Sequence, residues 1–287
     1  IFLTLPRAVV AAHRVEEVID TDPAVKDGPA TASPAGHEGE IAFEHVGFRY
    51  PGAADYVFRD VSFTAKKGET VAFIGSTGSG KSTLIGLVPR LYDATEGSVK
   101  VDGLDVREYA QDTLHEKLGY VPQRAVIFSG TIDSNVRYGS TAEERTAEDV
   151  KKAIAVAQAA DFVDKKEGGI QSPTMQYGTN LSGGQKQRLA IARAVCRRPE
   201  FYIFDDSFSA LDYKTDRALR TALKKETGGV TTLIVAQRIG TVMDADRIVV
   251  LDDGRVAGVG THRELLHGCQ VYREIAESQL SPEELGI

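Results

Sequence analysis

The nonapeptide GSTGSGKST, residues 75–83, follows the short apolar run VAFIG and opens the helical pattern KSTLIGLVPRL. It matches the pattern G-x-x-x-x-G-K-[ST] and has the strand before it and the helix after it that this pattern requires. Its three glycines let backbone N–H groups curl around phosphate oxygens, and the start of the helix adds a partial positive charge. The stretch therefore predicts a phosphate-binding loop on an α/β scaffold.

Outside this loop, patterns typical of strands alternate with patterns typical of helices. Residues 130–200 have mostly helical spacing. Thr146 with Asp149 fits a capping box, and Thr261 with Glu264 fits another that opens a C-terminal helical segment. Strand patterns occur at IAFEHVGFRY (41–50), VFRDVSFTA (57–65), FYIFDD (201–206), TTLIVAQ (231–237) and RIVVLDDGRVAGVG (247–260). This alternation predicts an α/β fold with a largely parallel sheet, interrupted by one helical insertion.

The overall composition excludes some classes of protein. The 287 residues include 34 Lys and Arg against 41 Asp and Glu, a net charge of −7, whereas nucleic-acid binding needs a basic face. Cys196 and Cys269 are far apart and lack metal-ligand spacing, so we assign them no chemistry. No apolar run reaches the length of a membrane-spanning helix. Because the net charge is negative, we expect no nucleic-acid partner.

The first forty residues divide into two segments of different character. IFLTLPRAVVAAHRVEEVID, residues 1–20, carries one apolar stripe at helical spacing. It is either a surface helix packed on its own domain or the tail of a helix that runs down from an upstream domain. DTDPAVKDGPATASPAGHEGE, residues 20–40, is rich in Pro, Ala, Gly and Asp and has no periodicity, which predicts a linker.

A second candidate part of the site is FYIFDDSFSALD, residues 201–212. A strand here, parallel to VAFIG, would present Asp205 beside the phosphate loop, where a metal ion bound to phosphates would lie. Lys81 can reach the β- and γ-phosphates, and the Ser82 hydroxyl group can ligate Mg²⁺. The pattern thus predicts a phosphate and Mg²⁺ site at the end of this strand.

A third motif, LSGGQ at residues 181–185, precedes the helical run KQRLAIARAV. Ser182 and the two glycines would expose backbone N–H groups at the start of a helix over residues 184–197, which makes a second anion site. One chain therefore carries two helix starts suited to phosphate.

The motifs GSTGSGKST, YVPQ, LSGGQ, FYIFDD and SALD make the chain resemble the nucleotide-binding domain of an exporter-type ATP-binding cassette (ABC) transporter over about residues 40–280. The resemblance implies a P-loop NTPase fold with a RecA-like parallel-sheet core, an antiparallel β subdomain and a helical subdomain at about residues 125–197. It implies ATP and Mg²⁺ as ligands and head-to-tail closure with a second such domain. It also implies the tail of a membrane-domain helix (1–22), a linker (23–40), the ABC domain (41–280) and a C-terminal tail (281–287).

The resemblance implies a role for each motif residue. Tyr50 would stack on adenine, Gln123 of YVPQ would touch the metal, and Asp205 would bind Mg²⁺ through water. Residues 209–212 would cross the seam between the two domains. The chain's own nucleotide would lie against Gly75, Ser76, Thr77, Gly78, Ser79, Gly80, Lys81, Ser82 and Thr83, with Lys81 also catalytic. The partner's nucleotide would lie against Leu181, Ser182, Gly183, Gly184 and Gln185.

Two residues that the family uses in ATP hydrolysis differ from the family's pattern in this chain. The residue after the metal-binding Asp is usually Glu, which orients the attacking water, and here it is Asp206; a later His that contacts the γ-phosphate is here Gln237. Aspartate is shorter by one methylene group, and a misplacement of about 1 Å can cost on the order of a hundredfold in rate. Glutamine can donate a hydrogen bond but cannot carry a proton as histidine can. We expect firm ATP binding and poor hydrolysis, unless Asp206 acts through a bridging water or a small strand shift.

Several functions remain open at this stage. The first is the ATP-binding half of a heterodimeric exporter at the cytoplasmic face of the cell membrane. Its upstream membrane domain is absent here, and its partner is a different chain that carries the Glu and His. The alternative is a catalytically competent homodimeric exporter motor. A soluble ABC ATPase that remodels DNA or ribosomes predicts coiled-coil insertions, a second cassette or a basic surface, which the sequence lacks. A metabolic P-loop kinase would have no use for LSGGQ.

Overall fold

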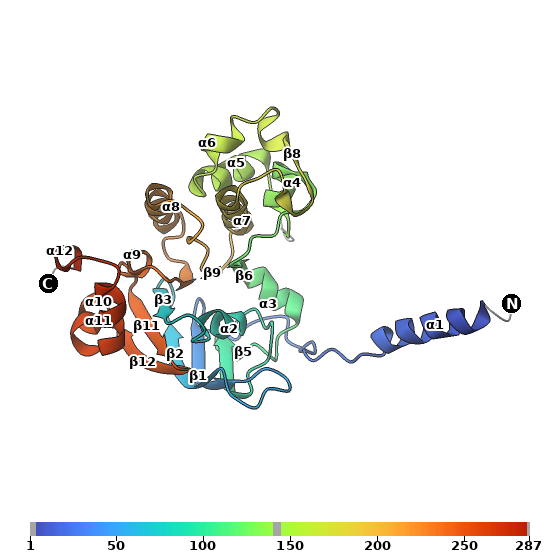
Figure 1. The fold of residues 1–287 in the computed structure, drawn as a ribbon, viewed down its shortest axis with the longest axis horizontal. Coiled ribbons are helices and arrows are strands. Elements are labelled where there is room, and N and C mark those ends of the chain that lie inside the picture. The colour runs from blue at the N-terminus through green and yellow to red at the C-terminus, as the bar shows by residue number, and fades with distance from the viewer. Residues whose placement is uncertain (1–3, 140–144, 286–287) are drawn as a thin grey trace.

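The computed structural model of the protein describes residues 4–139 and 145–285. Figure 1 shows a body built of sheets and flanking helices, a group of helices above it, and one helix, α1, that extends away from it. A six-stranded sheet and a four-stranded sheet form the body. The predicted fold class is therefore confirmed, with a parallel core, an antiparallel sheet and a helical insertion.

The central sheet has its strands in the order β12-β11-β3-β10-β9-β6, and all neighbours are parallel except β11 with β12. Strands β9 and β10 are buried along their whole length, as expected for parallel strands covered on both faces. Val235 of β10 pairs with Phe73 of β3 and with Asp205 of β9, so these strands end at the same edge. The strands are β3 (Thr70–Gly75), β6 (Leu118–Val121), β9 (Phe201–Asp205), β10 (Thr231–Val235), β11 (Arg247–Asp252) and β12 (Arg255–Gly260).

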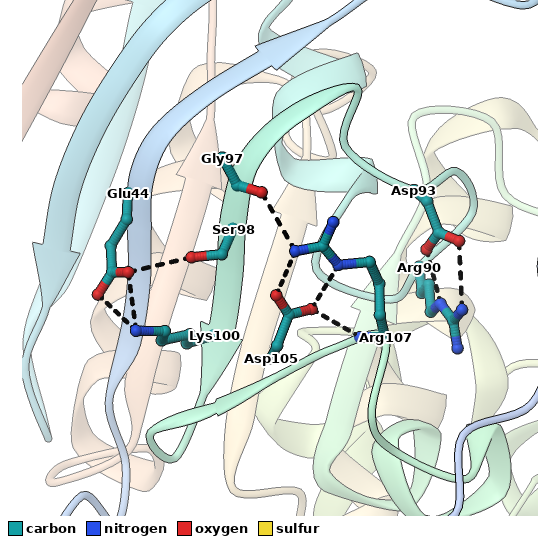
Figure 2. A network of polar contacts seen from close by, with 8 residues as sticks. All are labelled: Glu44, Arg90, Asp93, Gly97, Ser98, Lys100, Asp105 and Arg107. Atoms are coloured by element: carbon teal, nitrogen blue, oxygen red, sulfur yellow. Dashed lines mark hydrogen bonds and ion pairs between the residues drawn. The ribbon is translucent and has the colours of Figure 1, made fainter.

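The second sheet is antiparallel, in the order β2-β1-β4-β5, and packs with β3 and helix α2 (Lys81–Gly86) around one core. The rings of Phe43 and Phe63 stack in this core with their centroids 4.5 Å apart. Polar side chains pair along the same sheet, where Lys100 contacts both carboxylate oxygens of Glu44 (Figure 2). The strands are β1 (Ile41–Phe48), β2 (Phe58–Ala65), β4 (Glu96–Val101) and β5 (Leu104–Asp105).

The helical group lies within residues 130–197. Thr146 and Asp149 form the capping box at the start of α5, as the sequence predicted. A small two-stranded antiparallel sheet of β7 (Gly130–Thr131) and β8 (Pro173–Thr174) accompanies the helices. The helices of this group are α4 (Ile132–Arg137), α5 (Ala147–Val156), α6 (Ala160–Val163) and α7 (Gly183–Arg197).

The remaining helices flank the central sheet. Helix α2 is shorter than the predicted run, because it ends at Gly86 and Pro89 has no N–H group to continue it. Thr261 and Glu264 form the second predicted capping box. These helices are α3 (Gln111–Lys117), α8 (Tyr213–Glu226), α9 (Ile239–Val242), α10 (His262–Gly268), α11 (Gln270–Glu277) and α12 (Pro282–Leu285).

Helix α1 (Leu5–Ile19) has no buried residue, so it is not the packed surface helix that was one of the two alternatives. In the part of the chain that the structure describes, no helix is both long and apolar enough to cross a membrane. The helical prediction for this segment is thus confirmed, and its docking on the domain is not.

Residues 27–40, called the strap below, lie against the domain although they fall in the predicted linker. Gly28 N–H donates to Tyr109 O at 3.0 Å, and Ala110 N–H donates to Ala30 O at 2.8 Å. Further along, Gly39 N–H donates to Asp102 Oδ1 at 2.7 Å. The buried Asp102 also accepts from Lys117 Nζ at 2.9 Å. The absence of periodicity in this segment correctly indicated that it forms no helix or long strand. It did not indicate that the segment is hydrogen-bonded to the domain.

Candidate active site

The phosphate loop has the backbone that its glycines allow. Gly75 has φ +152, and a Cβ there would lie 1.9 Å from Leu251 O. Gly80 has φ +90, and a Cβ there would lie 2.8 Å from Val57 Cγ1. Gly80 is also the N-cap of α2, and no side chain caps this helix start. Other residue types would strain or block the loop at these positions. Because no side chain caps the start of α2, its backbone N–H groups can bind an anion.

Lys81 is buried inside this loop and points back at it. Its Nζ donates to Gly75 O at 2.9 Å, to Ser76 O at 2.7 Å and to Ser79 Oγ at 3.1 Å. Burial lowers the pKa of Lys81, and the nearby carboxylates of Asp206 and Asp205 oppose this shift. All three hydrogen-bond acceptors are neutral, so Lys81 has no direct ion pair among them and could bind a phosphate group.

Ser82 and Asp205 meet at the end of β9, where the sequence predicted the metal. Ser82 Oγ donates to Asp205 Oδ1 at 2.6 Å, and Tyr120 OH lies 3.5 Å from Oδ2. Burial raises the pKa of Asp205, and the hydrogen bond from Ser82 opposes that shift. Hydroxyl and carboxylate oxygens suit Mg²⁺, which keeps several waters and takes phosphate oxygens as well. No group of three or more His, Cys, Asp or Glu able to hold a metal occurs within residues 4–139 and 145–285.

Asp206 is held by two amides, an arrangement called the amide clamp below. Gln123 Nε2 donates to Asp206 Oδ2 at 3.1 Å, and Gln237 Nε2 donates to the same oxygen at 3.0 Å. Asp206 is buried, with φ +44 in the left-handed region and its N–H bonded to Val235 O. The structure therefore brings together three predicted site residues, and in it the side chain of Gln123 contacts Asp206.

Tyr50 forms one wall of a cavity of about 540 Å³. Its hydroxyl group lies 2.9 Å from Thr83 Oγ1, and its ring packs edge-on against Tyr92 with the centroids 5.3 Å apart. Arg90 forks onto Asp93 at 2.7 and 3.2 Å, which shapes the turn that carries Tyr92 (Figure 2). A flat aromatic group could enter beside the exposed Tyr50 ring. The cavity is also lined by Ala24 and Val25, which precede the strap.

The LSGGQ motif starts helix α7, one residue earlier than predicted, at Gly183. Ser182 is its N-cap, and Ser182 and Gln185 bond each other's backbone N–H groups in a capping box. Leu181 is buried, whereas Ser182 and Gly183 are exposed. A Cβ on Gly183 would meet nothing within 4 Å, so this helix start is open to an incoming group.

Two residues that the sequence reasoning missed support the loops of the site. Arg238 donates to Ser209 O at 3.1 Å and to Leu211 O at 3.3 Å, which ties the loop after β10 to the predicted seam loop. Gln279, two residues after the end of α11, donates to Gln237 O at 2.8 Å. Arg238 directly follows the predicted site residue Gln237, so its position in the sequence could have indicated a role at the site. No motif near Gln279 in the sequence indicates such a role.

Comparison with known proteins agrees with this geometry. A family model described as ABC transporter matches residues 58–209, just over half of the chain. An uncharacterized ABC transporter ATP-binding protein of Mycobacterium tuberculosis is 47% identical over 277 residues, which are 96% of this chain and 47% of that protein. An ATP-dependent lipid A-core flippase of Alkalilimnicola ehrlichii is 41% identical over 262 residues, covering 91% of this chain and 44% of the flippase.

A solved structure is similar over the same extent. The structure of a bacterial Atm1-family ABC exporter with ATP bound has a TM-score of 0.88 and 34% identity, over 96% of this chain and 48% of that one. The chain thus spans about half the length of the curated relatives that it matches.

Proposed function

The chain belongs to the ABC transporter family, and from this premise we propose that it is the ATP-binding part of an exporter whose own site binds MgATP firmly and hydrolyses it slowly. Phosphates would lie along residues 75–83, with Lys81 supplying charge, and the base would stack on Tyr50. Ser82, Asp205 and Gln123 would hold Mg²⁺. When bound, the ion would neutralise charge on the phosphate oxygens.

The amide clamp is the observation that carries the slow hydrolysis. Asp206 Oδ2 already accepts hydrogen bonds from Gln123 and Gln237, so one of the two carboxylate oxygens of the would-be general base is engaged. Both donors are neutral amides that cannot take up a proton. A positioned general base contributes about 10²–10⁴ in rate, and a displacement of about 1 Å can remove on the order of a hundredfold.

The intact LSGGQ motif supports a role at a second nucleotide. Ser182 and Gly183 are exposed at the start of α7, where backbone N–H groups suit a phosphate. The partner would be a second half-transporter, a different chain with Glu and His at the equivalent positions, and residues 209–212 would lie in the seam between them. The chain covers only about half the length of its relatives, which supports an upstream membrane domain that α1 continues, at the cytoplasmic face of the membrane. Within the chain, residues 41–280 would be the ABC domain.

The test is to lengthen the acid. Asp206→Glu, and Asp206→Glu combined with Gln237→His, should raise steady-state ATP hydrolysis by about a hundredfold while ATP affinity changes less than about threefold. Asp133→Glu makes the same chemical change in an acid that pairs with Arg137 on α4, and it should leave the rate unchanged.

The opposite result is also clear. If the unmodified chain hydrolyses ATP briskly as a dimer of itself, and the longer acid adds less than about threefold, the slow-site proposal is wrong. The homodimeric motor is then the better description.

A further inference from the structure

Gln279 follows helix α11 and lies well beyond the residues 58–209 that match the family model. Its side-chain Nε2 donates to Gln237 O at 2.8 Å. Its Oε1 accepts from the N–H group of Ile239 at 2.9 Å. The single amide therefore brackets Arg238, because it bonds the backbone on both sides of that residue.

The end of α11 holds Gln279 firmly enough to serve as a support. Tyr272 and Ala276 of this helix are fully buried in the core. The N–H groups of Gln279 and Leu280 both donate to Ala276 O, at 3.1 and 3.0 Å. Gln279 is thus presented by a helix end that is packed into the domain.

The loop after β10 is only partly fixed by burial, because Ala236 and Ile239 are buried whereas the two residues between them are not. Gln237 and Arg238 are exposed, and β10 ends at Val235 whereas α9 begins at Ile239. Hydrogen bonds hold the loop from two sides, through Arg238 to residues 209 and 211 and through Gln279 to the backbone. The direction of the Gln237 side chain depends on these peptide units.

We propose that Gln279 is a positioning residue for the nucleotide site. It fixes the loop so that the Gln237 amide faces Asp206 and the terminal phosphate, and it thereby couples the C-terminal helices to the discrimination of ATP from ADP. It touches neither nucleotide nor metal and acts through Gln237. The inference rests on the proposed MgATP site and adds a residue outside the motifs that define it.

The experiment compares the affinities for ATP and ADP. Gln279→Ala should weaken ATP binding about fivefold and change ADP binding less than twofold, because ADP lacks the phosphate that Gln237 faces. Gln270→Ala is the matched control, since Gln270 is an exposed glutamine at the start of α11 whose amide, within the described residues, bonds Glu274 and no loop of the site. It should change neither affinity. Equal losses for ATP and ADP would mean that Gln279 is merely structural, and the inference would fail.

Two further measurements separate the mechanism from the proposed function. In a Gln237→Ala background, Gln279→Ala should have no additional effect on ATP affinity, and an additive loss would contradict action through Gln237. Amide hydrogen exchange at Ile239 should accelerate in Gln279→Ala but much less in Gln279→Glu, which keeps the acceptor. This readout needs no nucleotide. Failure of the protein to bind ATP would therefore overturn the proposed nucleotide site. Unchanged hydrogen exchange at Ile239 in Gln279→Ala would instead show that Gln279 does not hold the backbone around Arg238.

Discussion

Tyr50 makes two separable contributions to the candidate site, one through its ring and one through its hydroxyl group. The ring is exposed beside the cavity and is supported edge-on by Phe48 and Tyr92. The hydroxyl group lies 2.9 Å from Thr83 Oγ1 in the phosphate loop. Either part could account for nucleotide affinity, and substitution separates them.

We expect Tyr50→Leu to weaken ATP binding about tenfold, because stacking of a base on an aromatic ring is worth about 1–3 kcal/mol. Tyr50→Phe keeps the ring and loses only the contact with Thr83, so its affinity should stay within about threefold. Equilibrium titration with a fluorescent ATP analogue measures both. If the Phe variant binds as poorly as the Leu variant, the hydroxyl contact rather than stacking determines the affinity.

Helices α10 and α11 meet through a contact between the half-buried His262 and the buried Tyr272. His262 Nδ1 lies 2.7 Å from Tyr272 OH, and His262 Nε2 is buried without a hydrogen-bond partner within the described residues. Burial lowers the pKa of His262, the charge of Asp244 opposes the shift, and Arg263 adds to it. The folded state therefore favours the neutral imidazole more than the unfolded state does.

The pH dependence of stability follows from that direction. Above the ordinary His pKa of about 6.5 both states are neutral and the residue has no effect, whereas below it the unfolded chain takes up a proton first. The wild type should therefore lose stability as the pH falls from about 7 toward 5, and His262→Gln should lose less. Urea unfolding at several pH values measures this, with His267→Gln on the same helix as control. An equal loss in the wild type and the His262 variant would contradict the assignment.

The strap connects the segment that follows α1 to the nucleotide-binding body. Gly28 lies so close to the body that a Cβ there would be 2.3 Å from the backbone oxygen of Glu108. Lys117, which bonds Asp102 beneath the strap, also bonds Glu200 just before β9. The chain is thus fastened at the strand ends opposite the phosphate loop.

We expect Gly28→Ala to release the strap without harming the site. Limited proteolysis should cut within residues 27–40 several times faster, while ATP affinity stays unchanged. Gly268→Ala is the control, because a Cβ at Gly268 would meet nothing within 4 Å. Unchanged cleavage of the Gly28 variant would show that the backbone absorbs the added methyl group, and the strap would then be less tightly attached than its contacts indicate.

The sequence alone determined the features that depend on neighbouring residues. The phosphate loop, the buried strand that ends at Asp205, and the capping boxes at Thr146 and Thr261 were all predicted correctly. Glycine placement, apolar runs and the three-residue spacing of a capping box are local signals, so a single sequence is enough to read them.

Only the tertiary structure decided which distant segments touch. Gln123 meets Asp206 across 83 residues of sequence and Gln279 meets Gln237 across 42, and the strap is bonded through backbone N–H and C=O groups. Strand order sets the first contact and the packing of α11 on the central sheet sets the second, and the alternation of elements in the sequence specifies neither. The strap contacts at Gly28 and Ala30 are made by backbone groups that nearly every residue type carries, so no residue pattern in the sequence predicts them.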